Sequence, residues 1–430
     1  MYLTKNSIIP SPSSIISLLD VYASRMPQYI DYDVAHYWAS HLTTTAEKQT
    51  KMLSDLLSMN IGTISGTNET KDWILSHGYG NYFKKTKTGI SLDKNDVEEI
   101  LLRDIPDDLR AVLMLSRDLS QTTGARGTLL SLMQNPMSDK LSYEKHRMLE
   151  CKPIWDIQNT GRIGMKKPAI QNIDRILQPV MTVPEGYVYV HADSGQCEPR
   201  ITMSWILKDP VLNKLVMMYN DAYYAYVHYV MYADTLVGNP DEWKPFEITD
   251  ELKHQRKDIK TFVNAVMYGA TSNPTNNPVK GGLIKRIGEH PMRKAHVHEL
   301  ENLIRTNKPI CTYFGTEIDI YASDKLKDID AGYYDTELLK LAINNPIQGT
   351  AADLMRYSAS AVSQLLMSKA KKSHILNYIH DAVTLAVHED DFPKIENDLN
   401  DLVAYEVEGW LPITQDLEIG RQEGIMPYVY

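Results

Sequence analysis

Apolar and polar positions change their spacing several times along the chain, and these changes predict where helices and strands lie. Helical spacing predicts a small helical region over residues 1–65, with Ile15 and Leu19 on its apolar face. Over residues 66–150, helical patterns flank a lysine-rich loop at 84–89. Long helices around a basic loop could grip a phosphate backbone, but a solvated charge run between surface helices gives the same pattern.

Strand-like patterns flank a long helical stretch in the second half of the chain. Residues 186–192 alternate like a half-buried strand, and Asp193 follows where the alternation ends. Apolar runs on either side of His380 and Asp381 predict a β-hairpin with these two residues at its tip. Helical spacing dominates between them, and Thr350 with Asp353 predicts the start of a helix at 351. Sheet segments interrupted by a helical insertion predict an α+β fold.

One predicted helix carries a polar stripe opposite a core-forming face. Arg256, Lys260, Asn264 and Tyr268 recur every four residues and therefore lie along one side of a helix. The cations can contact phosphate oxygens, and the tyrosine can stack on a base. A solvated basic helix face would show the same spacing, so this stripe alone does not decide between the two readings.

Asp193 and Asp381 are candidate ligands for hard cations. Magnesium prefers carboxylate oxygens completed by water and substrate phosphates, and a pair of ions can stabilise both oxygens of a phosphoryl transfer. Taken singly, each aspartate is more often an ordinary turn residue. The pair becomes informative only if the fold brings the two carboxylates together.

Composition narrows the classes of protein. The chain has 430 residues, of which 43% are hydrophobic and 23% charged, as expected for folded domains. Three cysteines suit a reducing, cytoplasmic compartment and predict neither a disulfide framework nor a zinc knot. No apolar run is long enough for a membrane span, so we expect no membrane partner. The formal net charge of −10 does not exclude DNA, because local clusters set the field that DNA meets.

The order of these motifs resembles family A DNA polymerases, the polymerase I lineage that includes many phage replicases. Its motifs A, B and C resemble Asp193–Arg200, Arg256–Gly269 and His380-Asp381. Further family phrases are similar to Thr160-Gly161-Arg162 with Gln171-Asn172, to residues 345–353 and to residues 85–89. The resemblance spans about residues 66–430, and it rests on the order of six motifs rather than on any single one.

The resemblance implies a right-hand polymerase and a division of the chain. The palm carries an antiparallel sheet, helical fingers are inserted in the palm, and the thumb is helical. The expected segments are a short helical N-terminal region at 1–65, a thumb at 66–150, the first part of the palm at 151–205, fingers at 206–330 and the second part of the palm at 331–430.

The resemblance also implies roles for individual residues in template-directed addition of deoxynucleotides to a primer 3′ end. Asp193 and Asp381 would hold two Mg²⁺ ions, for which Mn²⁺ is a possible substitute, and Lys260 would be the third catalytic residue as a proton donor to pyrophosphate. The residues expected to bind the deoxynucleoside triphosphate are Arg256, Lys260, Asn264, Tyr268, Gln196 and Glu198. The residues expected to contact primer-template DNA are Arg162, Gln171, Asn172, Gln348 and His380.

Three positions depart from the family pattern. Ala382 stands where the family has a glutamate after His380-Asp381, which removes a supporting carboxylate. Asn264 replaces an aromatic residue that packs against the incoming sugar. The loop Thr312–Glu317 has no arginines after its glycine, so template contacts from that loop are weakened or reassigned.

Several alternatives and expectations remain open at this stage. A single-subunit RNA polymerase shares this architecture, but Glu198 would crowd a ribose 2′-hydroxyl. A catalytically impaired DNA-binding protein is the alternative motivated by Ala382 and Asn264. A two-metal nuclease is a further alternative, but it would not explain the polar stripe from Arg256 to Tyr268. Because the residues before the predicted thumb are too few for a 3′–5′ exonuclease domain, we expect no proofreading in this chain. We therefore hypothesise a separately encoded exonuclease or processivity factor as a partner, and the host cytoplasm as the location if a bacteriophage encodes the chain.

Overall fold

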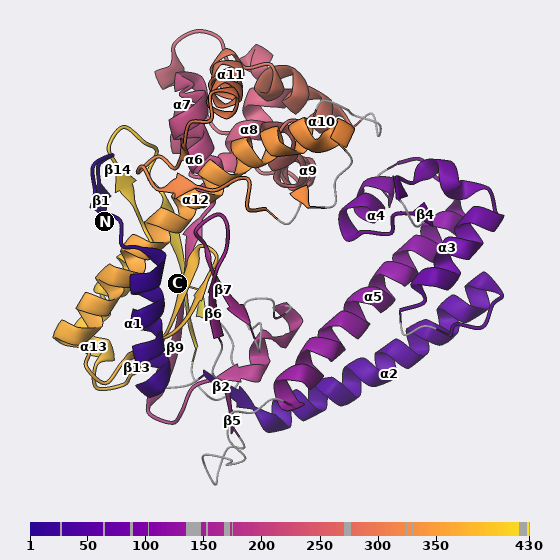
Figure 1. Ribbon diagram of the computed structural model, residues 1–430, viewed down its shortest axis with the longest axis horizontal. Helices are drawn as coiled ribbons and strands as arrows, with labels where there is room; N and C mark the ends of the chain where they lie inside the picture. Colours follow the sequence, from indigo (N-terminus) through magenta and orange to yellow (C-terminus); the bar gives the residue numbers. More distant parts are fainter. Residues whose placement is uncertain are drawn as a thin grey trace. The chain divides into compact units, whose positions relative to one another are not determined.

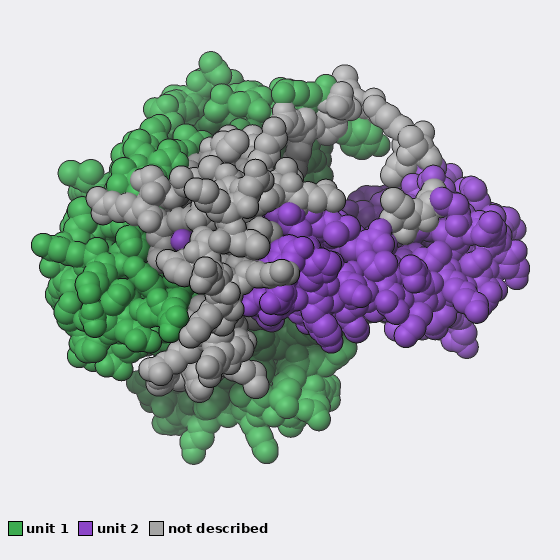
Figure 2. Space-filling model, turned by 90° about the horizontal axis from the view of Figure 1, so that it is seen from below, with its two compact units in different colours: residues 1–27, 154–166, 183–430 green, residues 28–153, 167–182 purple. Residues whose placement is uncertain are grey.

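The computed structural model describes the chain in two compact units. The described residues are 1–25, 28–62, 65–86, 89–101, 103–134, 148–151, 154–166, 173, 175–270, 277–323, 326–327, 331–420 and 428–429. Unit 1 comprises residues 1–27, 154–166 and 183–430, and unit 2 comprises residues 28–153 and 167–182 (Figure 2).

Unit 1 is built around a five-stranded antiparallel sheet. The strand order is β12-β13-β9-β15-β16, and each neighbouring pair runs antiparallel. The strands are β9 (Tyr187–Gly195), β12 (His374–Ile379), β13 (Ala382–His388), β15 (Thr414–Gly420) and β16 (Tyr428–Val429). Strand β13, which lies between β12 and β9, is buried along almost its whole length, which explains its continuous apolar run.

Two helices pack against the β12 edge of this sheet. Helix α1 (Pro12–Arg25) and helix α12 (Ala331–Lys369) both contact β12 and each other (Figure 1). The Tyr22 hydroxyl lies 3.1 Å from the Ser363 hydroxyl and joins the two helices. The first part of the predicted 1–65 region, residues 1–27, therefore belongs to unit 1, whereas residues 28–65 lie in unit 2. The finer division into thumb, palm and fingers stays a prediction.

A helical region with its own apolar core lies between β9 and α12 in sequence. Its core includes the predicted buried face Ile259, Phe262, Val263 and Val266. Its main elements are α6 (Cys197–Ile201), the π-helical segment η4 (Thr202–Leu207), α7 (Pro210–Tyr219), α8 (Ala222–Met231), α9 (Asp250–Met267), α10 (Pro278–Leu283), the π-helical segment η7 (Ile284–Gly288) and α11 (Pro291–Arg305). The polar stripe and the core-forming face of α9 are thus both confirmed.

Short strand pairs and single turns complete unit 1. The strand pairs are β1 (Tyr2–Leu3) with β14 (Glu406–Val407), β6 (Ile154–Ile157) with β7 (Ile163–Lys166), and β10 (Ile310–Cys311) with β11 (Glu317–Ile318). The short helices are α13 (Phe392–Ile395), η5 (Ala233–Thr235), η6 (Pro240–Glu242) and η9 (Asp398–Asp401).

Unit 2 is mainly helical, and its two longest helices lie side by side (Figure 1). Its helices are α2 (Tyr32–Leu57), α3 (Thr67–Ser76), η1 (Tyr79–Tyr82), α4 (Lys94–Leu101), α5 (Asp107–Gln134) and η3 (Arg175–Val180). Its strands are β2 (Gln28–Asp31), β3 (Lys85–Thr86), β4 (Gly89–Ile90), β5 (Met148–Cys151) and β8 (Met181–Thr182). Two residues of the predicted basic loop, 87 and 88, lie outside the described residues.

Two local predictions from the sequence were wrong. Asp193 is not beyond its strand, because β15 extends the pairing of β9 as far as Gly195. Thr350 does not begin a helix, because α12 already starts at residue 331 and runs through Pro346. The Thr350 hydroxyl donates to the Pro346 carbonyl at 2.7 Å, so it uses an acceptor in the preceding turn of the same helix.

Candidate functional site

The two predicted metal-binding aspartates come together at one end of neighbouring strands, Asp193 on β9 and Asp381 in the turn just before β13. Ala382 pairs with Asp193 in the antiparallel register of β13 and β9, and Asp381 immediately precedes Ala382. The Ser194 amide donates to the Asp381 carbonyl at 2.9 Å. His380, with a φ of 50°, forms the tight turn between β12 and β13 and so places Asp381 at this position. Residues 188 positions apart thus lie at one point of the sheet.

The electrostatics of this pair favour binding of a cation. Burial, followed by the charges of Asp381, Asp416 and Glu418, raises the pKa of Asp193 to about 7, and only Lys260 opposes this shift. Burial also raises the pKa of Asp381, although the nearby Arg162 charge lowers it. A bound divalent cation would offset the burial and the charge repulsion that raise these pKa values.

The donor set at this position fits magnesium in part. Both side chains offer hard oxygen ligands, which is what Mg²⁺ prefers. No group of three or more histidine, cysteine, aspartate or glutamate side chains that could hold a metal occurs within the described ranges. Coordination by two aspartates would therefore have to be completed by water, backbone oxygens or substrate phosphates, which is common for magnesium.

A third carboxylate near Asp193 was missed in the sequence. Asp416 pairs with Asp193 in the register of β15 and β9, so the two side chains lie on the same face of the sheet. Its charge contributes to the raised pKa of Asp193. No sequence motif marks Asp416, because its role depends on which strand pairs with β9.

Glu198 lies between two other predicted site residues. The Arg162 guanidinium donates to Glu198 Oε1, and the Tyr268 hydroxyl donates to Glu198 Oε2 at 3.1 Å. Tyr268 is the C-cap of α9, and Gly269 follows with a φ of 107°, which a residue with a Cβ rarely adopts. Burial and the negative charge of Glu198 raise the pKa of Tyr268, so its hydroxyl remains a proton donor.

Arg256 is already engaged by an acidic partner. Its Nη2 and Nε atoms donate to Asp221 Oδ2 at 2.6 and 3.1 Å, and Gln196 Nε2 donates to the same oxygen at 2.7 Å. The guanidinium also lies 5.2 and 5.1 Å from the ring centroids of Tyr223 and Tyr224. Asp221, which the sequence analysis missed, is the N-cap of α8 and holds both predicted nucleotide-binding side chains in place.

The other predicted residues of α9 are less constrained. Lys260 is exposed and lies close enough to Asp193 to lower its pKa, but it makes no ion pair with a described residue. Its Nζ lies 6.0 Å from the Tyr223 ring centroid. Asn264 is half-buried between Lys260 and Tyr268 on the same side of the helix. An exposed cation and a small amide therefore lie along the stripe between Arg256 and Tyr268, which both have hydrogen-bond partners.

The structure describes only some of the residues predicted to contact primer-template DNA. Gln348 is half-buried in α12, and within the described part of the chain its side chain has no hydrogen-bond partner. Loss of hydration, followed by the Arg162 charge, lowers the pKa of His380, so the imidazole is neutral at pH 7. Gln171 and Asn172 lie outside the described residues.

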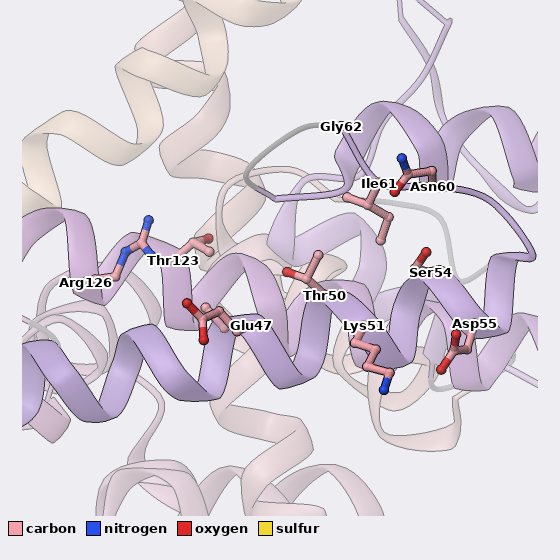
Figure 3. A pocket seen from close by; sticks show the side chains of 11 residues that line it. Glu47, Thr50, Lys51, Ser54, Asp55, Asn60, Ile61, Gly62, Thr123 and Arg126 are labelled. Carbon is pink, nitrogen blue, oxygen red and sulfur yellow. The ribbon is translucent and has the colours of Figure 1, made fainter.

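Unit 2 contains a cavity lined by none of the predicted site residues that the structure describes. The volume of a cavity therefore does not by itself identify the candidate site. The cavity holds about 530 Å³ and lies along α2 and α5, where Figure 3 shows Glu47, Lys51, Asp55 and Arg126 around it. These two acids and two bases form no ion pair among the described residues. Because their charges balance, the cavity shows no preference for an anion or a cation.

Comparison with known proteins identifies the family. A sequence model of DNA polymerase family A matches residues 39–424. The chain belongs to DNA polymerase family A. This confirms the resemblance found in the motifs.

Relatives in the family are bacterial enzymes called DNA polymerase I. That of Caldicellulosiruptor bescii is 24% identical over 364 residues, which cover 80% of this chain and 38% of that protein. That of Pseudomonas aeruginosa is 25% identical over 333 residues, which cover 71% of this chain and 32% of that protein. The chain thus spans about a third of the length of these family A relatives.

A solved structure confirms the predicted right-hand fold. The structure is the POL domain of Pol1 from M. smegmatis in complex with DNA primer-template and dNTP. It matches with a TM-score of 0.74 at 17% identity, over 95% of this chain and 69% of that chain. At this identity the match establishes the family A fold and leaves the roles of individual residues open. Separately, none of the helices within the described ranges has both the length and the apolarity to cross a bilayer.

Proposed function

We propose that this family A protein is a template-directed DNA polymerase that extends a primer 3′ end with deoxynucleotides. The observation that carries the proposal is that Asp193 on β9 lies beside Asp381 in the turn before β13, with Lys260 of α9 close enough to lower the pKa of Asp193. A carboxylate pair beside a cationic helix is suited to a phosphate substrate and its counter-ions. The proposed substrates are deoxynucleoside triphosphates and primer-template DNA.

The proposed cofactor is Mg²⁺, held by the two aspartates. When bound, the two ions would neutralise charge on the reacting phosphate and lower the pKa of the primer hydroxyl. The carboxylates must lose protons to hold the ions, so their raised pKa makes cation binding weaker in acid. Mn²⁺ is proposed as a substitute.

Two residues of α9 are proposed to bind the triphosphate and to assist the departure of pyrophosphate. Arg256 and Lys260 bind the triphosphate through charge-assisted hydrogen bonds, and Lys260 gives a proton to the departing pyrophosphate. For Arg256 this requires exchanging the Asp221 oxygen for a phosphate oxygen, because its guanidinium is occupied. Lys260 needs no such exchange, because it has no ion pair with a described residue.

Glu198 is proposed to select deoxyribose. Its carboxylate is held from both sides by Arg162 and Tyr268, so it cannot readily rotate away from an added 2′-hydroxyl. This fixed geometry favours the DNA polymerase over the RNA polymerase alternative. Gln348 and His380 are proposed to contact the primer-template, since their side chains keep free polar groups.

Extension of a labelled primer tests the proposal directly. With Mg²⁺ and all four deoxynucleotides, we expect extension that depends on the template and is much weaker with ribonucleotides. Asp193→Asn and Asp381→Asn should each lower the rate by orders of magnitude while DNA affinity changes little. Full activity in either variant would contradict the metal assignment, and no extension by the unmodified chain with Mg²⁺ or Mn²⁺ would favour a catalytically impaired binding protein, the outcome that Ala382 suggests.

A matched pair of lysines on α9 tests the nucleotide site. Lys260→Ala should raise the KM for the nucleotide and lower kcat, because the lysine binds phosphate and donates a proton. Lys257→Ala removes an equally exposed lysine, one turn earlier and off the stripe, and should change neither value. Equal losses in the two variants would indicate a general charge effect and contradict the assignment.

We propose that this polymerase acts in the cytoplasm. Among the cysteines whose side chains the structure describes, Cys197 and Cys311 are free thiols, which suits the reducing cytoplasm. A phage origin stays a prediction, because the relatives compared above are bacterial enzymes.

A further inference from the structure

Four aromatic side chains gather in unit 1 on segments that supply none of the proposed catalytic residues. We call Trp205, Tyr313, Phe314 and Trp410 the aromatic cluster. Trp205 belongs to the π-helical segment η4, Tyr313 and Phe314 to the turn between β10 and β11, and Trp410 to the turn after β14. Ring centroids are 4.5 Å apart for Tyr313–Trp410, 5.8 Å for Trp205–Tyr313 and 6.3 Å for Phe314–Trp410. All four side chains are only half-buried.

Two neighbouring cavities open at this cluster. Each holds about 350 Å³, and Trp205 and Tyr313 line both of them. Trp410 lines the first cavity and Phe314 the second. A volume of this size lies at the small end of ligand pockets and can hold one nucleotide. Two cavities that share aromatic walls match two consecutive bases of a strand.

Polar groups around the cluster lack protein partners. Within the described part of the chain, neither the Trp205 nor the Trp410 indole N–H, nor the Tyr313 hydroxyl, has a hydrogen-bond partner. Asn213 lines the first cavity, and its Oδ1 atom is buried without a partner. Of these groups only Asn213 Oδ1 is buried, where an acceptor is ordinarily satisfied, so this acceptor and the three donors are available to a polar ligand.

The charged groups at the cavities are mainly basic. Lys208 lines the first cavity and Lys5 the second, where its Nζ lies 5.9 Å from the Tyr313 ring centroid. Glu408 lines the first cavity as well. None of the three forms an ion pair with a described residue. Two lysines against one glutamate favour an anionic ligand such as a phosphate backbone.

The turns that present these rings are held firmly. The Tyr313 amide donates to Thr350 Oγ1 at 3.0 Å, and the Thr316 hydroxyl donates to Asp353 Oδ1 at 2.9 Å. On the other side, the Leu411 amide donates to Ser204 Oγ at 3.0 Å. A platform fixed in this way loses little conformational entropy when a ligand binds.

We propose that the aromatic cluster binds single-stranded nucleic acid, with bases stacked on Tyr313, Trp410 and Trp205 and phosphates beside Lys5 and Lys208. Aromatic platforms flanked by cations bind single strands because every base offers a face for stacking. A protein partner would also use aromatic residues, but it would not account for the unpaired lysines beside unsatisfied polar groups. This site is independent of the proposed catalysis, because it shares no residue with it.

The test uses the full chain and a short fluorescent oligo(dT), with anisotropy as the readout. Excess unlabelled blunt-ended hairpin DNA occupies any duplex-binding site, so that the signal reports a separate site. Trp410→Ala and Tyr313→Ala should each weaken oligo(dT) binding by about tenfold, as expected for loss of one stacked base. Trp410→Phe should retain most of the affinity, and Trp243→Ala serves as the matched control, because Trp243 is a half-buried tryptophan outside the cluster.

A second variant covers the case in which an aromatic substitution disturbs folding. Lys5→Gln with Lys208→Gln changes only surface charge and should reduce the salt dependence of oligo(dT) binding by about two phosphate contacts. Unchanged affinity in the alanine variants, or an unchanged salt dependence in the lysine variant, would overturn the proposal. Primer extension is measured in parallel: oligo(dT) binding without extension would contradict only the proposed polymerase function, and extension without oligo(dT) binding would contradict only this site.

Discussion

At the scale of single residues, the two aspartates proposed to bind metal lie where a negative charge is electrostatically unfavourable. Asp193 and Asp381 are partly buried next to each other, and Asp416 adds a further negative charge. The Arg162 charge offsets part of this at Asp381, although its guanidinium is also paired with Glu198. Sites that act on charged substrates often keep such strain, because the ligand relieves it.

Asp193→Asn should therefore stabilise the metal-free protein while abolishing extension. A pKa of about 7 in place of 3.8 means that the folded state binds this proton more tightly than the unfolded state does. The stabilisation that comes from this protonation is complete below about pH 4 and is lost as the pH rises through about 7. At about pH 8 the substitution should raise the free energy of unfolding by at most about 4 kcal/mol, from about 1.4 kcal/mol per pKa unit.

Urea unfolding in EDTA at about pH 8 and pH 4 measures this difference. The gain should vanish at the lower pH, where the wild-type carboxyl group is already neutral. Glu396→Gln, an exposed acid in the same unit, should change stability little at either pH. A loss of stability in Asp193→Asn at about pH 8 would mean that the carboxylate is stabilised by the protein itself.

Asp416 provides a separate prediction at the residue scale. Asp416→Asn removes a charge that raises the pKa of Asp193, so the metal-free carboxyl group should lose its proton at lower pH. The acidic limb of the pH–rate profile should move down by a fraction of a unit at subsaturating Mg²⁺. If Asp416 instead helps to hold the cation, the Mg²⁺ concentration needed for half-maximal rate should rise as well. An unchanged profile would show that the register pairing has no effect on the site.

At the scale of elements, the spacing of apolar residues predicted the β12–β13 hairpin and helix α9. It did not predict which other strands pair with them. The apolar runs on both sides of His380 and Asp381 were enough to predict β12 and β13, because both strands are buried. The end of β9 was misplaced because it depends on β15, which lies 223 residues away at the Asp193–Asp416 pair and shows little alternation of its own. Thr350 was misread because its hydroxyl serves α12 internally instead of beginning it.

Close packing around α12 leads to a prediction about Gly349. A Cβ at this position would lie 2.6 Å from Ile318 Cδ1 and 3.2 Å from the Thr160 carbonyl oxygen. Gly349→Ala should lower the free energy of unfolding by about 1–3 kcal/mol, because the backbone of the neighbouring segment cannot move aside easily. The variant should also disturb the turn that carries Tyr313.

Gly124→Ala is the matched control for this substitution. Gly124 also lies inside a long helix, but nothing in the described structure lies within 4 Å of its Cβ position. Alanine should therefore stabilise α5 by about 0.5–1 kcal/mol through its better helix propensity. Thermal unfolding with separate probes for the two units measures both effects. Equal changes in the two variants would contradict the packing argument.

At the scale of the whole molecule, the family and fold could be predicted because they depend on motif order along the chain. The supporting residues could not, because tertiary packing brings them in from other elements. Asp221 lies 35 residues before Arg256, at the start of a different helix. In the sequence, it cannot be distinguished from an aspartate that only caps a helix. Asp416 likewise acquires a role only through its register with Asp193.

The balance of charge over the whole chain gives the last prediction. The net charge of −10 opposes DNA binding, and Arg162 and Arg256 are neutralised by Glu198 and Asp221. Affinity for primer-template must then come from other cations, each of which releases counter-ions from a phosphate. We expect binding of a primed duplex to weaken steeply with salt, with a slope of about 0.9 per phosphate contact in a plot of log affinity against log salt concentration. Arg256→Gln should leave that slope unchanged, because its charge is already matched by Asp221. Fluorescence anisotropy over a series of salt concentrations measures both slopes, and a flat response from the unmodified chain would exclude duplex binding driven by local basic residues.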